Sequence, residues 1–114
     1  MHIEIYKKRS DIGGIVHTHS PYATGFSFSD KKITRLEGFG KIKDHYLKEI
    51  EYAPPGSRDL VDSAVKGLEN EDVLILKNHG VLTLGMDLDE AALLAEFTES
   101  SAKTEFVIRL LKDE

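Results

Sequence analysis

The most constraining feature of this sequence is a pair of histidines, His17 and His19, at the end of the short apolar run Ile15-Val16. On an extended strand alternate side chains share a face, so both imidazoles are expected to point one way and Thr18 the other. Because the two apolar residues are adjacent, the strand is predicted to be covered on both faces. Two imidazoles at one strand end form part of a metal site, which needs a further ligand.

A second apolar stretch ends on another histidine far downstream. Residues 73–76 are apolar and lead into a short connection that contains Asn78, His79 and Gly80, after which residues 81–84 are again apolar. Asparagine and glycine tolerate the positive φ that a tight connection needs. The pattern therefore predicts two strands joined by a hairpin, with the histidine at its tip.

The candidate metal ligands are His17, His19 and His79. The chain has no cysteine, so a metal would be held by histidine, carboxylate or water. Spacing alone leaves a simpler alternative open, because a single histidine is more often a surface or core residue with a hydrogen-bond partner. That simpler interpretation is the one adopted for His45, expected to be exposed or paired with a neighbouring aspartate, and for His2, expected to pack or cap near the terminus.

Helical patterns occupy the stretches between these strands. Ser20-Pro21 is typical of a helix start, a capping hydroxyl followed by proline in the first turn. Ser57 follows a Pro-Pro-Gly turn and precedes an apolar stripe at helical spacing that ends at Asn70. An Asp-x-x-Glu pair at residues 87–90 resembles a capping box and predicts a helix that runs to about Leu111. The apolar face of that helix is expected to contain Leu94, Phe97, Ser101, Thr104, Ile108 and Leu111.

Three further segments carry weaker signals. Residues 2–9 are read as a helical turn or two with a basic end. The alternation over residues 46–53 predicts a strand. Residues 31–43 show no clear helix or strand pattern. Here a short strand at Ile33 and a loop at residues 38–40 are expected.

Length, charge and the lengths of the apolar runs indicate which partners and which cell compartment to expect. The 114 residues are expected to form one domain, 1–114, and the net charge of −5 disfavours nucleic acid, whose binding requires neutralising phosphates. No apolar run approaches the ~20 residues that span a bilayer, and no signal-peptide pattern is visible. A cytoplasmic protein without membrane or nucleic-acid partners is expected.

Three strings resemble the family of class II sugar-phosphate aldolases and epimerases, which includes fuculose-1-phosphate aldolase, ribulose-5-phosphate 4-epimerase and the adducin head domain. The strings are residues 12–24, residues 52–60, and residues 76–81 with Gly85 and Glu90-Ala91 behind them. The resemblance covers essentially the whole chain, which would be the later part of the family domain. It implies an α/β fold, a three-layer sandwich in which a mixed, largely antiparallel sheet lies between helices, incomplete at its N-terminal side.

The resemblance also implies a chemistry. In the family three histidines hold a divalent metal, usually zinc, and by motif these are His17, His19 and His79. The implied activity is that of a lyase that cleaves or epimerises a small phosphorylated sugar through a metal-stabilised enediolate. A homo-oligomer, usually a tetramer, is implied as well.

The sequence also departs from the family pattern. Family members carry a Ser-Ser-Glu segment just before the position of His2, and its acidic residue ligates the metal or acts as the general acid/base. The match to this chain begins after that segment and after the sugar-phosphate site, so the catalytic residue is unknown. Glu4 and Glu37 are best read as solvated surface carboxylates, and the region around Gly38-Phe39 lacks a tyrosine that some aldolases present to a neighbouring subunit. A catalytically impaired metal-binding or assembly module on the same scaffold is therefore the alternative function.

Overall fold

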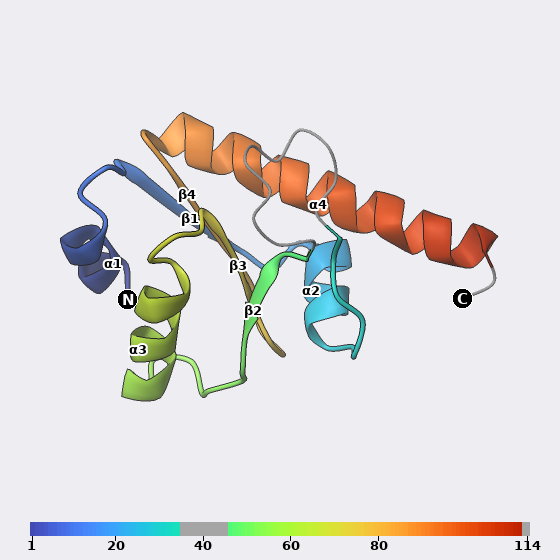
Figure 1. The fold of residues 1–114 in the computed structure, drawn as a ribbon, viewed down its shortest axis with the longest axis horizontal. Helices are drawn as coiled ribbons and strands as arrows, with labels where there is room; N and C mark the ends of the chain where they lie inside the picture. The colour runs from blue at the N-terminus through green and yellow to red at the C-terminus, as the bar shows by residue number, and fades with distance from the viewer. Residues whose placement is uncertain (35–45, 113–114) are drawn as a thin grey trace.

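The computed structural model describes residues 1–34 and 46–112. In chain order the elements are α1 (His2–Lys8), β1 (Gly14–Thr18), α2 (Pro21–Ser27), β2 (Lys48–Ile50), α3 (Arg58–Gly67), β3 (Val73–Leu76), β4 (Gly80–Gly85) and α4 (Leu88–Leu111). The four strands form one sheet in the order β1-β4-β3-β2, which lies between two helical layers, α1 and α3 on one face and α2 and α4 on the other (Figure 1). The β1/β4 and β3/β4 ladders are antiparallel and the β2/β3 ladder is parallel, as the predicted three-layer fold requires.

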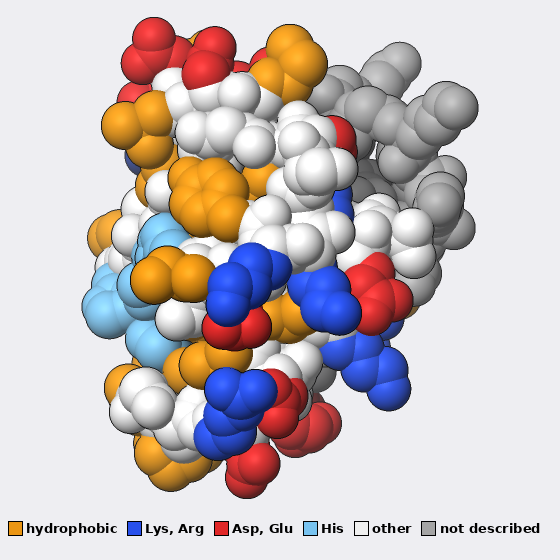
Figure 2. All heavy atoms as spheres, turned by 90° about the vertical axis from the view of Figure 1, so that its left-hand side faces the viewer, with side chains coloured by type: hydrophobic (Ala, Val, Ile, Leu, Met, Phe, Trp, Pro, Cys, Tyr) orange, Lys and Arg blue, Asp and Glu red, His pale blue; other side chains and the backbone are white. Residues whose placement is uncertain are grey.

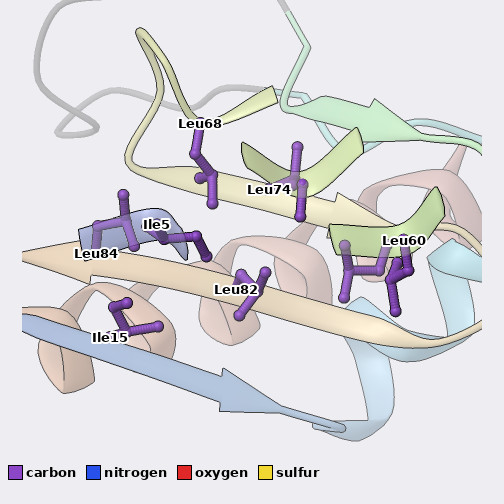
Figure 3. Packing of buried hydrophobic residues seen from close by; sticks show 9 residues of the cluster. Ile5, Ile15, Leu60, Leu68, Leu74, Leu82 and Leu84 are labelled. Atoms are coloured by element: carbon purple, nitrogen blue, oxygen red, sulfur yellow. The ribbon is translucent and has the colours of Figure 1, made fainter. Parts of the chain in front are cut away.

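Two apolar cores follow from side-chain alternation on the central strands. All residues of β3 and β4 are buried, because helices cover both faces of these strands. Leu74 and Leu82 face α1 and α3, whereas Ile75 and Val81 face α2 and α4. Figure 3 shows the first of these cores, in which Ile5 of α1 joins leucines of α3, β3 and β4.

The predicted hairpin between β3 and β4 is confirmed. Asn78 in the connection has φ 58°, the left-handed conformation that asparagine tolerates better than most residues. The N–H of His79 donates to the carbonyl of Leu76 at 3.1 Å and closes the turn. The histidine therefore lies at the end of two buried strands, which hold its backbone in place.

Two predicted boundaries are corrected. The strand predicted over residues 46–53 is limited to Lys48–Ile50, and the helix predicted to end at Asn70 ends at Gly67. The tyrosines at the two ends of the predicted strand are exposed, and only a short central stretch pairs with β3. Ser57 caps α3 as predicted, accepting a hydrogen bond from the Leu60 N–H at 3.2 Å.

The apolar face predicted for α4 is wrong in part. Phe97 is 37% exposed and Leu111 82% exposed, although Ser101 is buried as expected. The buried face instead carries small residues such as Ala91, Ala95 and Ala102, because the helix packs closely against the sheet. Hydrophobicity alone could not reveal this face, since large apolar side chains such as Leu93 and Leu110 are exposed. Leu94 is partly buried against the core, as predicted. No helix among the described residues is both long and apolar enough to cross a membrane.

Some predictions concern residues whose structure is not described. The loop at residues 38–40, Glu37 and His45 all lie outside the two described ranges. Near the start of this gap Thr34 forms an isolated antiparallel bridge with Tyr46, so Ile33 precedes a single bridge rather than lying in a strand.

Arg9 joins the end of α1 to the α3–β3 connection. Its guanidinium donates hydrogen bonds to the carbonyl oxygens of Leu68 and Glu71 at 2.7 and 3.0 Å, and to the carboxylates of Asp11 and Asp72. The hydrogen bonds to Asp11 raise the pKa of Arg9 above its ordinary value. The planar guanidinium of Arg9 therefore bonds to groups from two connections, the one after α1 and the one between α3 and β3.

Replacing Arg9 with alanine is expected to lower the free energy of unfolding by about 2 kcal/mol, because two carbonyls and two carboxylates lose a charged donor. Urea denaturation followed by circular dichroism measures the change. Arg58→Ala is the matched control. Arg58 pairs with Asp62 at 3.3 Å on the exposed side of α3, so its loss should cost less than about 1 kcal/mol. Equal losses in both variants would contradict the structural role of Arg9.

Candidate metal centre

Three histidines converge at one end of the sheet. His17 lies in β1, His19 follows the last residue of that strand, and His79 lies in the β3–β4 connection. The register pairs Thr18 with Val81, which places the end of β1 beside the start of β4 and so beside the hairpin tip. Figure 2 shows histidine side chains gathered in one group on the face of the molecule that it presents.

The three rings direct one nitrogen each toward a common point. Nε2 of His17 lies 3.0 Å from Nε2 of His19 and 3.2 Å from Nε2 of His79. The candidate ligand atoms all lie within 4.8 Å of one another. Tetrahedral zinc with Zn–N bonds of about 2.0–2.1 Å needs ligand nitrogens roughly 3.3 Å apart. The two distances from His17 are close to that value, and the ligand atoms of His19 and His79 lie within 4.8 Å of each other.

A backbone hydrogen bond fixes the protonation of the central ring. Nδ1 of His17 lies 2.9 Å from the carbonyl oxygen of Val81, and a carbonyl can only accept, so Nδ1 carries the proton. In the neutral ring Nε2 is then unprotonated and directs its lone pair toward the other two histidines. This is the arrangement by which an outer hydrogen bond selects the tautomer of a metal-binding histidine.

Nδ1 of His79 is buried and has no hydrogen-bond partner among residues 1–34 and 46–112. If Nε2 of this ring faces a metal, Nδ1 carries a proton that needs an acceptor. His79 is therefore a candidate metal ligand whose Nδ1 has no hydrogen-bond acceptor among the described residues.

Burial favours the neutral form of His17 and His79. Burial lowers the pKa of His17 below the ordinary histidine value, against the opposing effect of the Val81 carbonyl, and electrostatic repulsion from nearby His19 and His2 lowers it further. Burial also lowers the pKa of His79, and the other two rings of the cluster add to the effect. Neutral imidazole is the form that binds metal, so the lowered pKa values of His17 and His79 reduce competition from protons at these two ligands.

Gly80 allows the hairpin to approach β1. A Cβ at this position would collide with the carbonyl oxygen of Thr18 and would lie 2.7 Å from Cδ2 of His19. Only glycine therefore permits the observed distance between the strand end and the hairpin.

Sequence reasoning missed Glu99, which positions the segment after His19. The predicted helix start is correct, but the Ser20 side chain makes no capping hydrogen bond. The carboxylate of Glu99 in α4 instead accepts from the N–H groups of Tyr22 and Ala23 at 2.9 and 2.8 Å. No local spacing signal could have found this contact, because the partners lie 76 and 77 residues apart.

Glu4 and His2, the remaining candidates within the described ranges, lie outside the cluster. Glu4 pairs with Lys7 at 3.5 Å on α1, and His2 is exposed on the same helix. No aspartate or glutamate of the described ranges belongs to the cluster of His17, His19 and His79. Three neutral imidazoles would leave the whole positive charge of a bound metal available to negatively charged oxygens of a substrate.

The chain is similar in sequence to known class II aldolases. A sequence profile described as "Class II Aldolase and Adducin N-terminal domain" matches residues 1–106. An L-fuculose phosphate aldolase from Methanococcus maripaludis is 37% identical over 112 residues, which cover 98% of this chain and 61% of that protein. The corresponding enzyme from Methanocaldococcus jannaschii is 41% identical over 112 residues, with the same coverage of 98% and 61%.

Solved structures agree with these relatives. An L-fuculose 1-phosphate aldolase superposes with a TM-score of 0.86 at 27% identity, covering 96% of this chain and 52% of that chain. The L-fuculose-1-phosphate aldolase of Thermus thermophilus superposes with a TM-score of 0.78 at 25% identity, covering 97% of this chain and 60% of that chain. The chain thus spans about three fifths of the length of the two curated archaeal relatives.

Proposed function

Because this chain belongs to the class II aldolase and adducin family, we propose that it is a metal-dependent lyase that acts on a small phosphorylated sugar. The observation that carries the proposal is the convergence of Nε2 atoms from His17, His19 and His79. A divalent cation, zinc above all, suits three imidazole nitrogens at these separations.

Each histidine has a distinct part in this proposal. His17 is held by the Val81 carbonyl and presents a lone pair without rearrangement. His19 and His79 close the cluster from the strand end and from the hairpin. A bound metal would act as a Lewis acid that stabilises the negative charge developing on substrate oxygen as a carbon–carbon bond breaks. The rigid β-structure around the ligands keeps that geometry before substrate arrives.

The names of the relatives support a substrate class rather than one substrate. The Methanococcus protein is an L-fuculose phosphate aldolase, whereas a Bacillus thuringiensis relative at 29% identity is a 5-deoxy-D-ribulose 1-phosphate aldolase. Both names describe phosphorylated sugars cleaved by an aldolase. We therefore propose cleavage or epimerisation of a small sugar phosphate, and the tetramer implied by the family resemblance stays a prediction.

The alternative is a metal-binding or assembly module with impaired catalysis. It is favoured by one observation: no carboxylate of the described residues joins the histidine cluster, so a general acid/base is missing there. Loss of such a group typically costs 10²–10⁴-fold in rate.

Zinc binding and aldehyde release separate the two functions. The 114-residue chain would be titrated with zinc at pH 7.5 and then assayed with L-fuculose 1-phosphate and 5-deoxyribulose 1-phosphate. One equivalent of zinc with aldehyde release supports the lyase, and stoichiometric zinc without turnover supports the module. Failure to bind zinc would contradict both.

A further inference from the structure

A polar hollow lies beside β2, at the edge of the sheet opposite β1. It has a volume of about 510 Å³, and its lining includes β2 and Lys77. We call it the β2 hollow. A volume of this size lies within the range of small-molecule sites in proteins. His17, His19 and His79 are not among its lining residues, so the hollow is separate from the candidate metal centre.

Two oppositely charged side chains reach the β2 hollow from the same face of the sheet. In the parallel β2/β3 register Glu49 is the partner of Ile75, whose side chain packs in the core under α2 and α4. Register partners share a face, so Glu49 also points to that side. Lys77 follows β3, and its Nζ donates to the carbonyl oxygen of Ser29, just after α2, at 2.6 Å.

Neither of these two groups is paired with an opposite charge from residues 1–34 or 46–112. Both side chains are half-buried. Oε2 of Glu49 is buried and accepts no hydrogen bond from the described part of the chain. Lys77 donates one of its three N–H groups to Ser29, which leaves two for another acceptor. A buried acceptor without a donor costs free energy, so a ligand that supplies a donor to Glu49 would be stabilised here.

The other charges of the lining balance one another. Two positive and two negative side chains, all of them exposed, complete the charged lining: Asp30, Lys32, Lys48 and Glu51. The lining therefore has no formal net charge, in a chain whose net charge is −5. A simple anion or a simple cation would be attracted by one half-buried group and repelled by the other. A small molecule that carries both charges would be attracted by both groups.

We propose that the β2 hollow binds a zwitterionic α-amino acid. Its carboxylate accepts hydrogen bonds from Nζ of Lys77, and its ammonium group donates to the carboxylate of Glu49. Rotation about the last side-chain bond of Glu49, which has a broad energy minimum, turns an oxygen toward the ligand. Charge-assisted hydrogen bonds then satisfy both protein groups. Tyr46 and Leu47 also line the hollow and offer apolar contact to a short aliphatic side chain.

The test is binding of L-alanine to the full 114-residue chain. Propionate lacks the ammonium group of alanine and ethylamine lacks its carboxylate, so each compound is a matched half of the ligand. The chain is first stripped of metal with a chelator, which is then removed, because α-amino acids chelate metal ions and could bind through a cation at the histidine cluster.

Backbone amide NMR shifts at Glu49 and Lys77 report binding in the β2 hollow. We expect L-alanine to bind with a Kd on the order of 1 mM, a modest affinity for so small a ligand. It should bind at least about tenfold more tightly than propionate or ethylamine, because each half meets only one of the two charged groups.

Substitutions assign the two ends of the ligand. Glu49→Gln keeps the shape of the side chain and should weaken L-alanine at least about tenfold without weakening propionate. Lys77→Met should weaken L-alanine as much without weakening ethylamine. Lys66→Met and Glu69→Gln make the same exchanges at exposed positions in and after α3, so both should bind L-alanine as the parent does. Thermal unfolding identifies any variant that fails to fold, and the other hollow variant then decides.

Three outcomes would overturn the proposal. The first is a folded chain whose amide shifts do not change up to about 50 mM L-alanine, which would leave ordered water as the occupant of the hollow. The second is L-alanine that binds no more tightly than propionate or ethylamine. The third is binding indifferent to both Glu49→Gln and Lys77→Met. The titrations use metal-free chain and no turnover, so the result is independent of the proposed lyase activity.

Discussion

Replacing His79 with alanine is expected to weaken zinc binding by more than about 100-fold. Removing an outer hydrogen-bond partner of a metal ligand typically costs 10–100-fold in affinity, and removing a ligand itself should cost more. His79 is the only member of the cluster contributed by the β3–β4 hairpin, so two imidazoles from the β1 end would remain. Two imidazoles without a third ligand do not hold zinc tightly.

Competition with a chromophoric chelator at pH 7.5 measures the change in zinc affinity. His2→Ala is the matched control, because His2 is an exposed histidine on α1 that does not belong to the cluster. It should bind zinc as the parent chain does. Unaltered affinity in His79→Ala, or an equal loss in both variants, would show that the cation is bound elsewhere.

Replacing Gly80 with alanine is expected to damage both the fold and the site. The new methyl group would overlap the carbonyl oxygen of Thr18 and press on the ring of His19. Backbone cannot move aside as a flexible side chain can, so overpacking here should lower the free energy of unfolding by about 1–3 kcal/mol. Displacement of the imidazole should also reduce zinc affinity, by roughly tenfold or more if the ring moves by several tenths of an ångström.

Gly25→Ala is the control for this substitution. Gly25 lies in α2, and a Cβ there would meet nothing within 4 Å. Because alanine is a better helix former than glycine, this variant should be neutral or more stable by up to about 1 kcal/mol. Urea denaturation and zinc titration of both variants give the comparison. If Gly80→Ala behaves as Gly25→Ala does, the close approach of the hairpin to β1 is not a constraint.

Much of the fold was predictable because its signals are local. The apolar runs at residues 73–76 and 81–84, with Asn78 between them, identify a hairpin from a few consecutive residues. Ser57 and Asp87 cap the helices that follow them, accepting hydrogen bonds from the N–H groups of Leu60 and Glu90. Such contacts join residues three positions apart, so the sequence pattern contains both partners.

The errors arose where burial depends on distant neighbours. In α4 the largest apolar side chains do not mark the buried face, because the sheet accepts small residues such as Ala91 and Ala95 at close distance. Glu99 shows no recognisable pattern in the sequence, yet its carboxylate caps α2. Val16 was expected to be covered on both faces of its strand, and instead it lines an open groove.

The sequence by itself determined which residues could form the candidate site, because strand alternation places His17 and His19 on one face and a hairpin pattern presents His79. It also carried the family resemblance that the profile match confirms. Only the tertiary structure decided that Nε2 of His17 lies 3.0 and 3.2 Å from the Nε2 atoms of His19 and His79, and that the Val81 carbonyl sets the tautomer of His17. It also decided that no strand of the described ranges pairs with the outer side of β1. The physical reason is that these properties depend on strand order and register, which join residues more than sixty positions apart and leave no periodic signal in the chain.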